Sequence, residues 1–412
     1  METAPTAPAH TPPAPQAPRN MFWLIFLLGA LAALGPFSID TYLPAFPAIA
    51  QSFHTTVGEV EATLAVYFMG LSLGQLFYGP FADSYGRKPP LYVGLLLYIA
   101  SAIGCAFSTS IAMLTVLRFF QAVGGCSSML IARTVVRDYF PPREAARVFS
   151  FLMLVIGVSP VVAPLVGGYL VVHASWRSTF WVLTGLGIAC LLSVAIFLRE
   201  TLPQEHRRPF GISDVLGLYG RLLRDRTFMV HALAGSLVMA GLFAYLEGSP
   251  LVFIELNHVA ADRFGLFFGV IAAGLIGASQ INGILVRRAH PGTILRVVLF
   301  ASAASGVALF VTQASHVGGF PGLVALLFVS IGCVGFTSPN ATALAMAPHG
   351  KIAGNASAVL GCMQFAIGGA GGLLVSGLDN RTSIPMVAVM AVGACMALAI
   401  NLALAPKNEL LH

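Results

Sequence analysis

The chain carries very little charge. Of its 412 residues, 9% are Asp, Glu, Lys or Arg and 57% are hydrophobic, and the mean hydropathy is +0.85. A typical soluble domain has about 25% charged residues, so a globular fold surrounded by water is excluded. Apolar surface on this scale needs lipid as its solvent, and the sequence predicts a polytopic membrane protein.

Patterns typical of enzymes, metal sites and disulfide scaffolds are also missing. All six cysteines lie in apolar runs without a C-x-x-C pair, so we expect packing residues rather than disulfides or metal ligands. There is no nucleotide-binding loop, H-E-x-x-H motif or Ser/His/Asp arrangement, and the ten histidines are scattered. A membrane enzyme would need a catalytic cluster and a sensor an appended domain. The sequence therefore predicts a non-enzymatic protein without metal or cofactor.

Twelve apolar runs are long enough to cross a bilayer, which takes about 20 residues each. The predicted spans are 21–47, 58–80, 89–108, 110–134, 146–171, 175–198, 228–254, 264–286, 293–314, 320–346, 352–377 and 382–404. The first run is about twice the length of a signal-peptide core and is interpreted as a retained span. Residues 1–20 are rich in Pro and Ala and predict a disordered cytoplasmic tail.

The only long polar connection, 199–227, divides the chain into two halves of six spans, 21–198 and 228–405, followed by a short tail, 406–412. Glycines repeat between the halves at an offset of 204 residues: Gly79 matches Gly283, and Gly167-Gly168 match Gly371-Gly372. We therefore expect an all-α membrane protein of twelve helices in two pseudo-symmetric halves around a central cavity.

The positions of the basic residues predict the orientation in the membrane. With a cytoplasmic N-terminus, eighteen of the 22 Lys and Arg residues lie on the cytoplasmic side and three on the other. Cytoplasmic loops are enriched in these residues, so both termini are expected in the cytoplasm. The same loops account for the net charge of +6, and no nucleic-acid partner is expected.

Three motifs resemble those of the major facilitator superfamily. The loop GPFADSYGRK resembles its G-x-x-x-D-R-x-G-R-R/K motif, RFFQAVGG its R-x-x-Q-G-x-G pattern, and SPVVAPLVGG its antiporter motif, which is associated with export. The residues concerned are Gly79, Asp83, Gly86, Arg87 and Lys88; Arg118, Gln121 and Gly124; and Pro160, Pro164, Gly167 and Gly168.

Each motif also has a physical interpretation. In the first motif, glycines permit a tight turn and Asp83 can accept hydrogen bonds from Arg87, which predicts a conformational latch on the cytoplasmic side; a solvated loop is the alternative. In the antiporter motif, proline and glycine soften a helix and admit a close neighbour. An ordinary packing face made of small residues explains the same pattern.

Shorter matches favour one branch of this superfamily. The segments IDTYLPAFPAI, VRDYFPPREAAR, SWRSTFW and RETLP resemble the Bcr/CflA group of drug:proton antiporters in bacterial inner membranes. This resemblance implies a monomer that exports lipophilic drugs by alternating access, driven by a proton gradient. Export of a small metabolite, such as a sugar or an amino acid, by the same mechanism is the alternative.

Three charged residues interrupt the predicted spans. Asp40 lies about 10 Å and Arg118 about 12 Å below the outer edge, at 1.5 Å per residue, and Glu247 lies close to the symmetry-related position of Asp40. Because a charge in hydrocarbon is costly, we expect the three to form one proton-coupling layer in which Asp40 holds Arg118. A structural Asp–Arg clamp is the alternative.

Polar residues elsewhere in the spans are candidates for the substrate cavity. Lipophilic ligands need apolar walls with a few polar groups, although each polar residue could instead join two helices. The candidates are Tyr42, Tyr67, Gln75, Gln121, Asn340 and Gln364. Asn282 is expected to form a degenerate latch of the second half with Arg287 and Arg288.

Overall fold

The computed structural model describes residues 21–207, 211–378 and 381–405, and the predicted tails 1–20 and 406–412 lie outside them. Twelve helices of the described part are long and apolar enough to cross a membrane, as expected. The first half holds α1 (Met21–Asp40), η1 (Leu43–Ala45), α2 (Phe46–Phe53), α3 (Val57–Tyr85), α4 (Lys88–Ala106), α5 (Ile111–Tyr139), α6 (Pro142–His173) and α7 (Trp176–Phe197).

The second half repeats this pattern of six spans. It holds α9 (Arg226–Pro250), the π-helical η3 (Leu251–Leu256), α10 (Ala261–Leu285), α11 (Pro291–Ala314), α12 (Gly319–Met346), η4 (Ala347–Ile352), α13 (Ala353–Gly377) and α14 (Ile384–Leu404). The connection between the halves contains η2 (Gln204–His206) and the helix α8 (Ile212–Arg224). We call the side of the membrane that holds α8 the linker face, and the opposite side the far face.

Several helices begin where a short polar side chain caps the first turn. The side chains of Thr56, Ser110 and Asp225 accept hydrogen bonds from the backbone N–H groups of the third residue after each. Such a cap replaces one of the hydrogen bonds that the first helical turn lacks. These caps explain why α3, α5 and α9 begin at Val57, Ile111 and Arg226.

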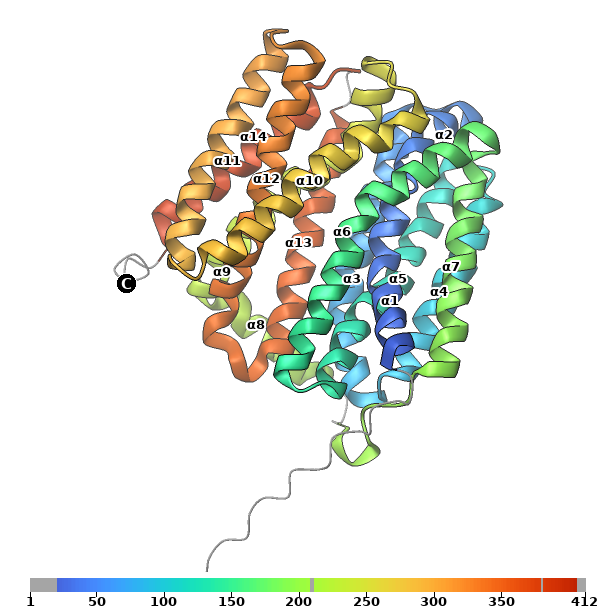
Figure 1. The fold of residues 1–412 in the computed structure, drawn as a ribbon, viewed down its shortest axis with the longest axis vertical. Helices are drawn as coiled ribbons and strands as arrows, with labels where there is room; N and C mark the ends of the chain where they lie inside the picture. The colour runs from blue at the N-terminus through green and yellow to red at the C-terminus, as the bar shows by residue number, and fades with distance from the viewer. Residues whose placement is uncertain (1–20, 208–210, 379–380, 406–412) are drawn as a thin grey trace, which may run out of the picture.

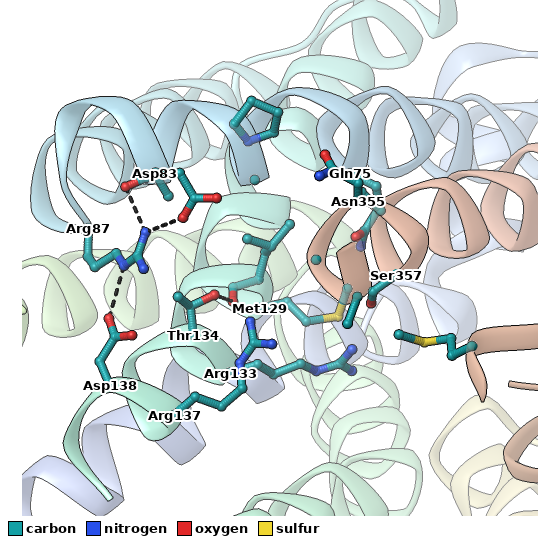
Figure 2. A pocket seen from close by; sticks show the side chains of 18 of the residues that line it. Gln75, Asp83, Arg87, Met129, Arg133, Thr134, Arg137, Asp138, Asn355 and Ser357 are labelled. Atoms are coloured by element: carbon teal, nitrogen blue, oxygen red, sulfur yellow. Dashed lines mark hydrogen bonds and ion pairs between the residues drawn. The ribbon is translucent and has the colours of Figure 1, made fainter. Parts of the chain in front are cut away.

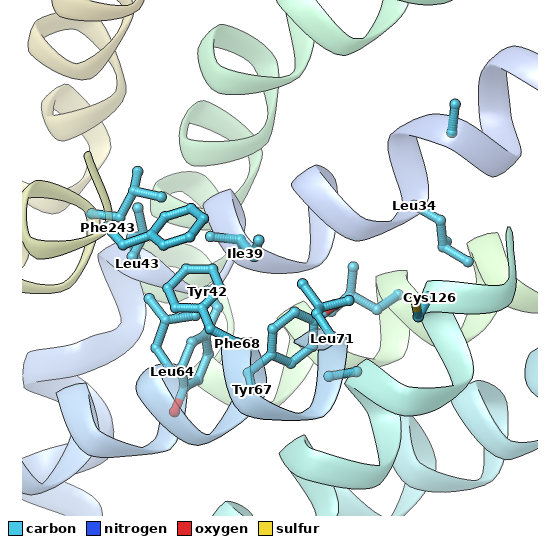
Figure 3. Packing of buried hydrophobic residues seen from close by; sticks show 14 of the residues in the cluster. Leu34, Ile39, Tyr42, Leu43, Leu64, Tyr67, Phe68, Leu71, Cys126 and Phe243 are labelled. Atoms are coloured by element: carbon cyan, nitrogen blue, oxygen red, sulfur yellow. The ribbon is translucent and has the colours of Figure 1, made fainter. Parts of the chain in front are cut away.

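The two halves meet along two pairs of helices, α3 with α13 and α6 with α10; α6 and α10 lie side by side in Figure 1. Small residues allow this approach, because a Cβ atom on Gly369 of α13 would lie 3.0 Å from the Ala65 carbonyl oxygen of α3. Aromatic rings fill the space between the halves. Phe68 of α3 stacks on Phe243 of α9 with centroids 4.2 Å apart (Figure 3).

The first span is longer than predicted and is not continuous. It reaches Phe53, and the α-helix stops at Asp40, where Thr41 and Tyr42 form a turn before η1 and α2. Pro44 and Pro47 lie at the start of these two short elements, where a missing N–H group is tolerated. Asp40 is therefore the last residue of the helix, and thirteen residues of the span follow it.

Candidate functional site

A central cavity of about 290 Å³ lies between the halves, with walls from α1, α3, α5, α6, α9, α10, α12 and α13. Asp40 is the charged residue among the described residues that line it, and almost every other lining residue is apolar. The Asp40 side chain is 4% exposed. Tyr245 of α9 lines the same cavity and interacts electrostatically with Asp40. The cavity thus combines apolar walls with one carboxylate.

Arg118 of α5 is fully buried inside the first half and does not reach this cavity. Its guanidinium carbon lies 4.4 Å from the centroid of the Tyr42 ring and 4.1 Å from that of Tyr67. Nη1 donates hydrogen bonds to the Gln121 side chain at 2.8 Å and to the Ser38 carbonyl at 3.3 Å. Two aromatic faces and two oxygen acceptors therefore stabilise the positive charge.

The expected ion pair between Asp40 and Arg118 is not formed among the described residues. The reason is the rotation of α1. Two residues along a helix differ by about 200° in direction, so Ser38 can face α5 while Asp40 faces the central cavity. Asp40 and Arg118 were expected to pair because they lie at similar depth in the membrane, but their side chains point in different directions.

Glu247 has a third environment. Its side chain is fully buried in α9, and neither carboxylate oxygen has a hydrogen-bond partner in the described part of the chain. It packs on Gly372 of α13 so closely that a Cβ atom there would overlap the carboxylate. Its charge interacts with that of Glu61 in α3, which is also fully buried. The three predicted coupling residues therefore do not form one cluster.

Glu61 was missed in the sequence analysis. It is the fourth residue of the predicted span 58–80, where it resembles a polar helix end. The signal that could have revealed it is the same one that identified Glu247, a carboxylate within an apolar run.

A second cavity of about 490 Å³ opens near the linker face between α3 and α5 of one half and α12 and α13 of the other. Figure 2 shows Asp83, Arg87 and Asp138 on one wall, with Gln75 and Asn355 on another part of the lining. Met129 lines both this cavity and the central one. The two cavities are therefore neighbours along the interface between the halves.

The predicted latch residues meet in a network of hydrogen bonds. Nη1 of Arg87 donates to Asp83 at 2.7 Å and to the Ala82 carbonyl at 2.8 Å, and Nε donates to Asp138 at 3.0 Å. Burial lowers the pKa of Arg87, but Asp138 and Asp83 more than offset this, so its pKa lies above the ordinary value. The pair of Asp83 and Arg87 is thus present as expected.

Glu200 and Asp138 complete this network and were not predicted. Glu200, in the RETLP segment, accepts hydrogen bonds from the backbone N–H groups of Arg87 at 2.8 Å and Lys88 at 3.0 Å, at the start of α4. Gly86 adopts φ +96°, and a Cβ atom there would lie 2.7 Å from the Glu200 carboxylate. Glycine is required at this turn for both reasons.

The network joins the ends of four helices of the first half. The Thr201 hydroxyl donates to Asp138 at 2.6 Å, so α5 and the end of α7 are tied to the turn between α3 and α4.

Gly79, the first glycine of the same motif, is not closely packed: a Cβ atom added there would meet no atom within 4 Å. The Lys88 ammonium lies 5.5 Å from the centroid of the Tyr92 ring.

The antiporter motif in α6 supports the break of α1. A Cβ atom on Gly167 would overlap the carbonyl of Thr41, the residue after Asp40, and one on Gly168 would overlap the Ala261 carbonyl of α10. Pro160 lines the central cavity, and Pro164 lies one turn further along the helix. The motif thus lies between the carboxylate-bearing turn and the opposite half.

The polar candidates for the substrate cavity divide into three groups. Gln75 lines the cavity at the linker face, whereas Tyr42, Tyr67 and Gln121 surround Arg118. Within the described part of the chain, neither Asn340 nor Gln364 lines these two cavities.

Asn340 joins two helices instead. It donates a hydrogen bond of 2.6 Å to the Asn282 side chain, linking α12 to α10. Asn282 therefore takes part in an interhelical contact, and no hydrogen bond between its side chain and Arg287 or Arg288 is formed among the described residues.

Comparisons with known proteins agree with this architecture. The model of the Major Facilitator Superfamily matches residues 21–373. An uncharacterized MFS-type transporter of Bacillus subtilis, YdgK, is 37% identical over 90% of this chain and 92% of its own length. The bicyclomycin resistance protein homolog of Haemophilus influenzae is 31% identical over 93% and 95%, and a chloramphenicol resistance protein of Pseudomonas aeruginosa is 28% identical over 90% and 89%.

Solved structures show the same fold at low sequence identity. A D-xylose-proton symporter superposes with a TM-score of 0.73 at 13% identity, covering 94% of this chain and 98% of its own. A bacterial homolog of the human lysosomal transporter Spinster, in an inward-facing conformation, superposes with a TM-score of 0.71 at 16% identity, covering 92% and 96%. The resemblance to Bcr/CflA-type exporters is confirmed by the named relatives, and the chain belongs to the Major Facilitator Superfamily as a transporter related to drug-resistance proteins, not an enzyme.

Proposed function

We propose that the chain is a monomeric exporter of small lipophilic molecules, drugs among them, driven by protons across a bacterial inner membrane. The observation that carries this proposal is the central cavity, in which Asp40 is the charged residue among apolar walls. An apolar pocket with few polar groups suits lipophilic ligands. The relatives described as resistance proteins support the same substrate class.

Asp40 is proposed to exchange its proton against the drug. A proton that arrives from the far face neutralises the carboxylate, and the protein then turns its cavity to the linker face, which the basic residues orient toward the cytoplasm. A drug enters past Met129 and makes the neutral, protonated form of Asp40 less favourable, so that the proton leaves the carboxyl group. The cavity at the linker face lies next to the central one, which supports this route for the drug.

Arg118 is proposed to act as a positioning residue. Its hydrogen bond to the Ser38 carbonyl holds α1 two residues before Asp40, and Tyr42, which stacks on the guanidinium, lies two residues after it. Movement of the Asp40 turn therefore changes the surroundings of a buried cation, even though the two charges are not in contact. Arg87 with its partners holds the linker-face ends of α3, α4, α5 and α7 as a latch.

Export of a sugar or amino acid is the weaker proposal, because the lining of the central cavity offers few hydrogen-bonding groups for such a substrate. A susceptibility panel in an efflux-deleted strain tests the two. The strain expresses the unaltered chain, Asp40→Asn or Asp214→Asn, and its resistance to bicyclomycin, chloramphenicol and lipophilic organic cations is measured. Asp214 is an exposed acid of α8 and serves as the control. We expect resistance to at least one compound, lost with Asp40→Asn only. Resistance to none, together with export of a metabolite, would contradict the proposal.

A further inference from the structure

Two arginines line the cavity at the linker face without an acidic partner. Arg133 and Arg137 of α5 belong to its walls, and both side chains are exposed although they lie within a membrane span. Neither guanidinium forms an ion pair within the described part of the chain. The described acids of the same lining, Asp83 and Asp138, are bound by Arg87. Two positive charges of this cavity are therefore free to bind a ligand.

The two arginines share one face of α5 with residues that line the central cavity. Gly125 and Met129 line the central cavity, and Met129 also lines the one at the linker face. Arg133 and Arg137 follow at intervals of four residues, which places all four on the same side of the helix. At 1.5 Å per residue, the arginines lie about 6 and 12 Å from Met129 along the helix axis. One path therefore leads from apolar walls to two cations.

The opposite half contributes the beginning of α13 to the same cavity. Gly354, Asn355 and Ser357 of its first two turns line it. Figure 2 shows Arg133 and Arg137 next to each other, with Asn355 and Ser357 to their right on α13. No described side chain caps the first turn of this helix, and a helix N-terminus carries partial positive charge and N–H groups that can bind an anion. Both walls therefore favour a negative charge between the halves.

Orientation in the membrane does not account for these arginines by itself. Lys and Arg are favoured at the cytoplasmic ends of spans in any polytopic protein, and Arg137 lies in the last turn of α5, where a cation is favourable. Neither rule requires a cavity, an uncapped helix on the opposite wall or a position in line with the central cavity. Charged residues that face a cavity within a span mark ligand pathways. A ligand therefore explains the arrangement better than orientation does.

We propose that Arg133 and Arg137, together with the first turns of α13, bind the anionic group of an amphiphilic ligand, a carboxylate or a phosphate. The apolar part of this ligand extends past Met129 into the central cavity. A guanidinium suits either anion because it can donate two parallel hydrogen bonds. This inference rests on the proposed export function, and it names one class among the lipophilic substrates: those with an anionic group about 6–12 Å from the apolar part.

Binding of matched amphiphiles to the purified chain in nanodiscs of neutral lipid, measured by titration calorimetry, tests this site. Decyl phosphate is the probe. Decanol has the same apolar part without the charge, inorganic phosphate has the charge without the apolar part, and empty nanodiscs correct for partition into lipid. We expect decyl phosphate to bind at least about tenfold more tightly than either, since hydrogen bonds to charged groups contribute this much. When Arg133→Gln and Arg137→Gln are combined, this preference should disappear while decanol still binds.

Arg221→Gln is the matched control, because Arg221 is an exposed arginine of α8 outside the described lining of this cavity. It should keep the preference for decyl phosphate. Arg133→Lys, which keeps the charge but not the planar fork, should keep part of it. Decyl phosphate that binds the double variant as tightly as the unaltered chain would overturn the proposal. Inorganic phosphate that binds as tightly as decyl phosphate, or decanol that does so in the unaltered chain, would also overturn it.

The outcome is separable from that of the proposed function, because the binding measurement needs neither a gradient nor transport. Arginine-dependent binding in a chain that exports nothing contradicts export alone. Export of neutral lipophilic drugs by a chain whose binding of decyl phosphate does not depend on the two arginines contradicts the anion site alone.

Discussion

The cost of burying a charge identifies functional residues in this sequence but not the partners of those residues. Asp40, Arg118 and Glu247 could be found in the sequence because each interrupts an apolar run. Their partners could not. Ser38 and Asp40 point in different directions because of helix rotation, so that Arg118 binds the Ser38 carbonyl and not the carboxylate. The aromatic pair Tyr42 and Tyr67 was taken for cavity wall, yet it encloses a cation.

Arg118→Lys tests the aromatic enclosure. A lysine keeps the charge but lacks the planar group that stacks between two rings, so we expect a loss of about 1–2 kcal/mol in the free energy of unfolding. Thermal unfolding of the purified protein measures it. Arg263→Lys, at an exposed position of α10, should leave the transition unchanged. An unchanged transition for Arg118→Lys would mean that stacking contributes nothing.

Gly372→Ala tests the close packing of Glu247. Because the added methyl group would overlap the carboxylate, we expect a destabilisation of about 1–3 kcal/mol. In a chain that already carries Glu247→Ala, the same change should cost much less, since the overlapping group is gone. Gly377→Ala on the same helix, which meets no atom within 4 Å, is the control. Equal costs in both backgrounds would contradict this packing.

At the scale of elements, helix number and type followed from the sequence, but helix breaks did not. The spans were predictable because each apolar run has the length of a bilayer. The stop of α1 at Asp40 was not, because it depends on the tertiary contact with Gly167 of α6 as much as on Pro44. In the polar connection 199–227 we missed α8, whose Tyr219 hydroxyl donates to the Leu76 carbonyl of α3 at 2.9 Å. The latch was predicted in part, since Asp83 and Arg87 are close in sequence and Asp138 and Glu200 are not.

Gly167→Ala should disturb the break of α1. The new Cβ atom would collide with the Thr41 carbonyl, and relief requires a shift of the Asp40 turn or of α6. We expect a destabilisation of about 1–3 kcal/mol and a loss of transport in protein that remains folded. Gly185→Ala, at an exposed site of α7 without neighbours within 4 Å, should transport normally. Normal transport by Gly167→Ala would show that transport does not depend on the contact between the antiporter motif and the Asp40 turn.

Asp138→Asn tests the latch at the linker face. Asp138 accepts hydrogen bonds from both Arg87 and Thr201, and its charge offsets the burial of the guanidinium. We expect the variant to lose about 1–3 kcal/mol of unfolding free energy. The exposed Asp214→Asn serves as control in the same denaturation experiment. Equal stability of the two variants would show that the network holds nothing together.

The whole molecule has cavities toward both faces, of about 490 Å³ at the linker face and of about 460 and 300 Å³ at the far face, besides the central one. Composition alone fixed the class, because 57% hydrophobic residues leave no soluble alternative. The conformation lies beyond sequence reasoning, since alternating access gives one sequence at least two packings of similar free energy. In this packing the Phe68–Phe243 stack and the Ser376–Gly58 hydrogen bond join the two halves, and the cavity at the linker face adjoins the central cavity at Met129.

Substrate uptake into inverted membrane vesicles driven by a pH gradient measures whether Asp40 couples protons to the substrate. A compound from the susceptibility panel is followed with the unaltered chain, with Asp40→Asn and with Asp214→Asn at equal protein levels. We predict that the gradient drives uptake by the unaltered chain and by Asp214→Asn, and that Asp40→Asn shows no gradient-dependent uptake while still binding the compound. Gradient-driven uptake by Asp40→Asn at the unaltered rate would contradict it.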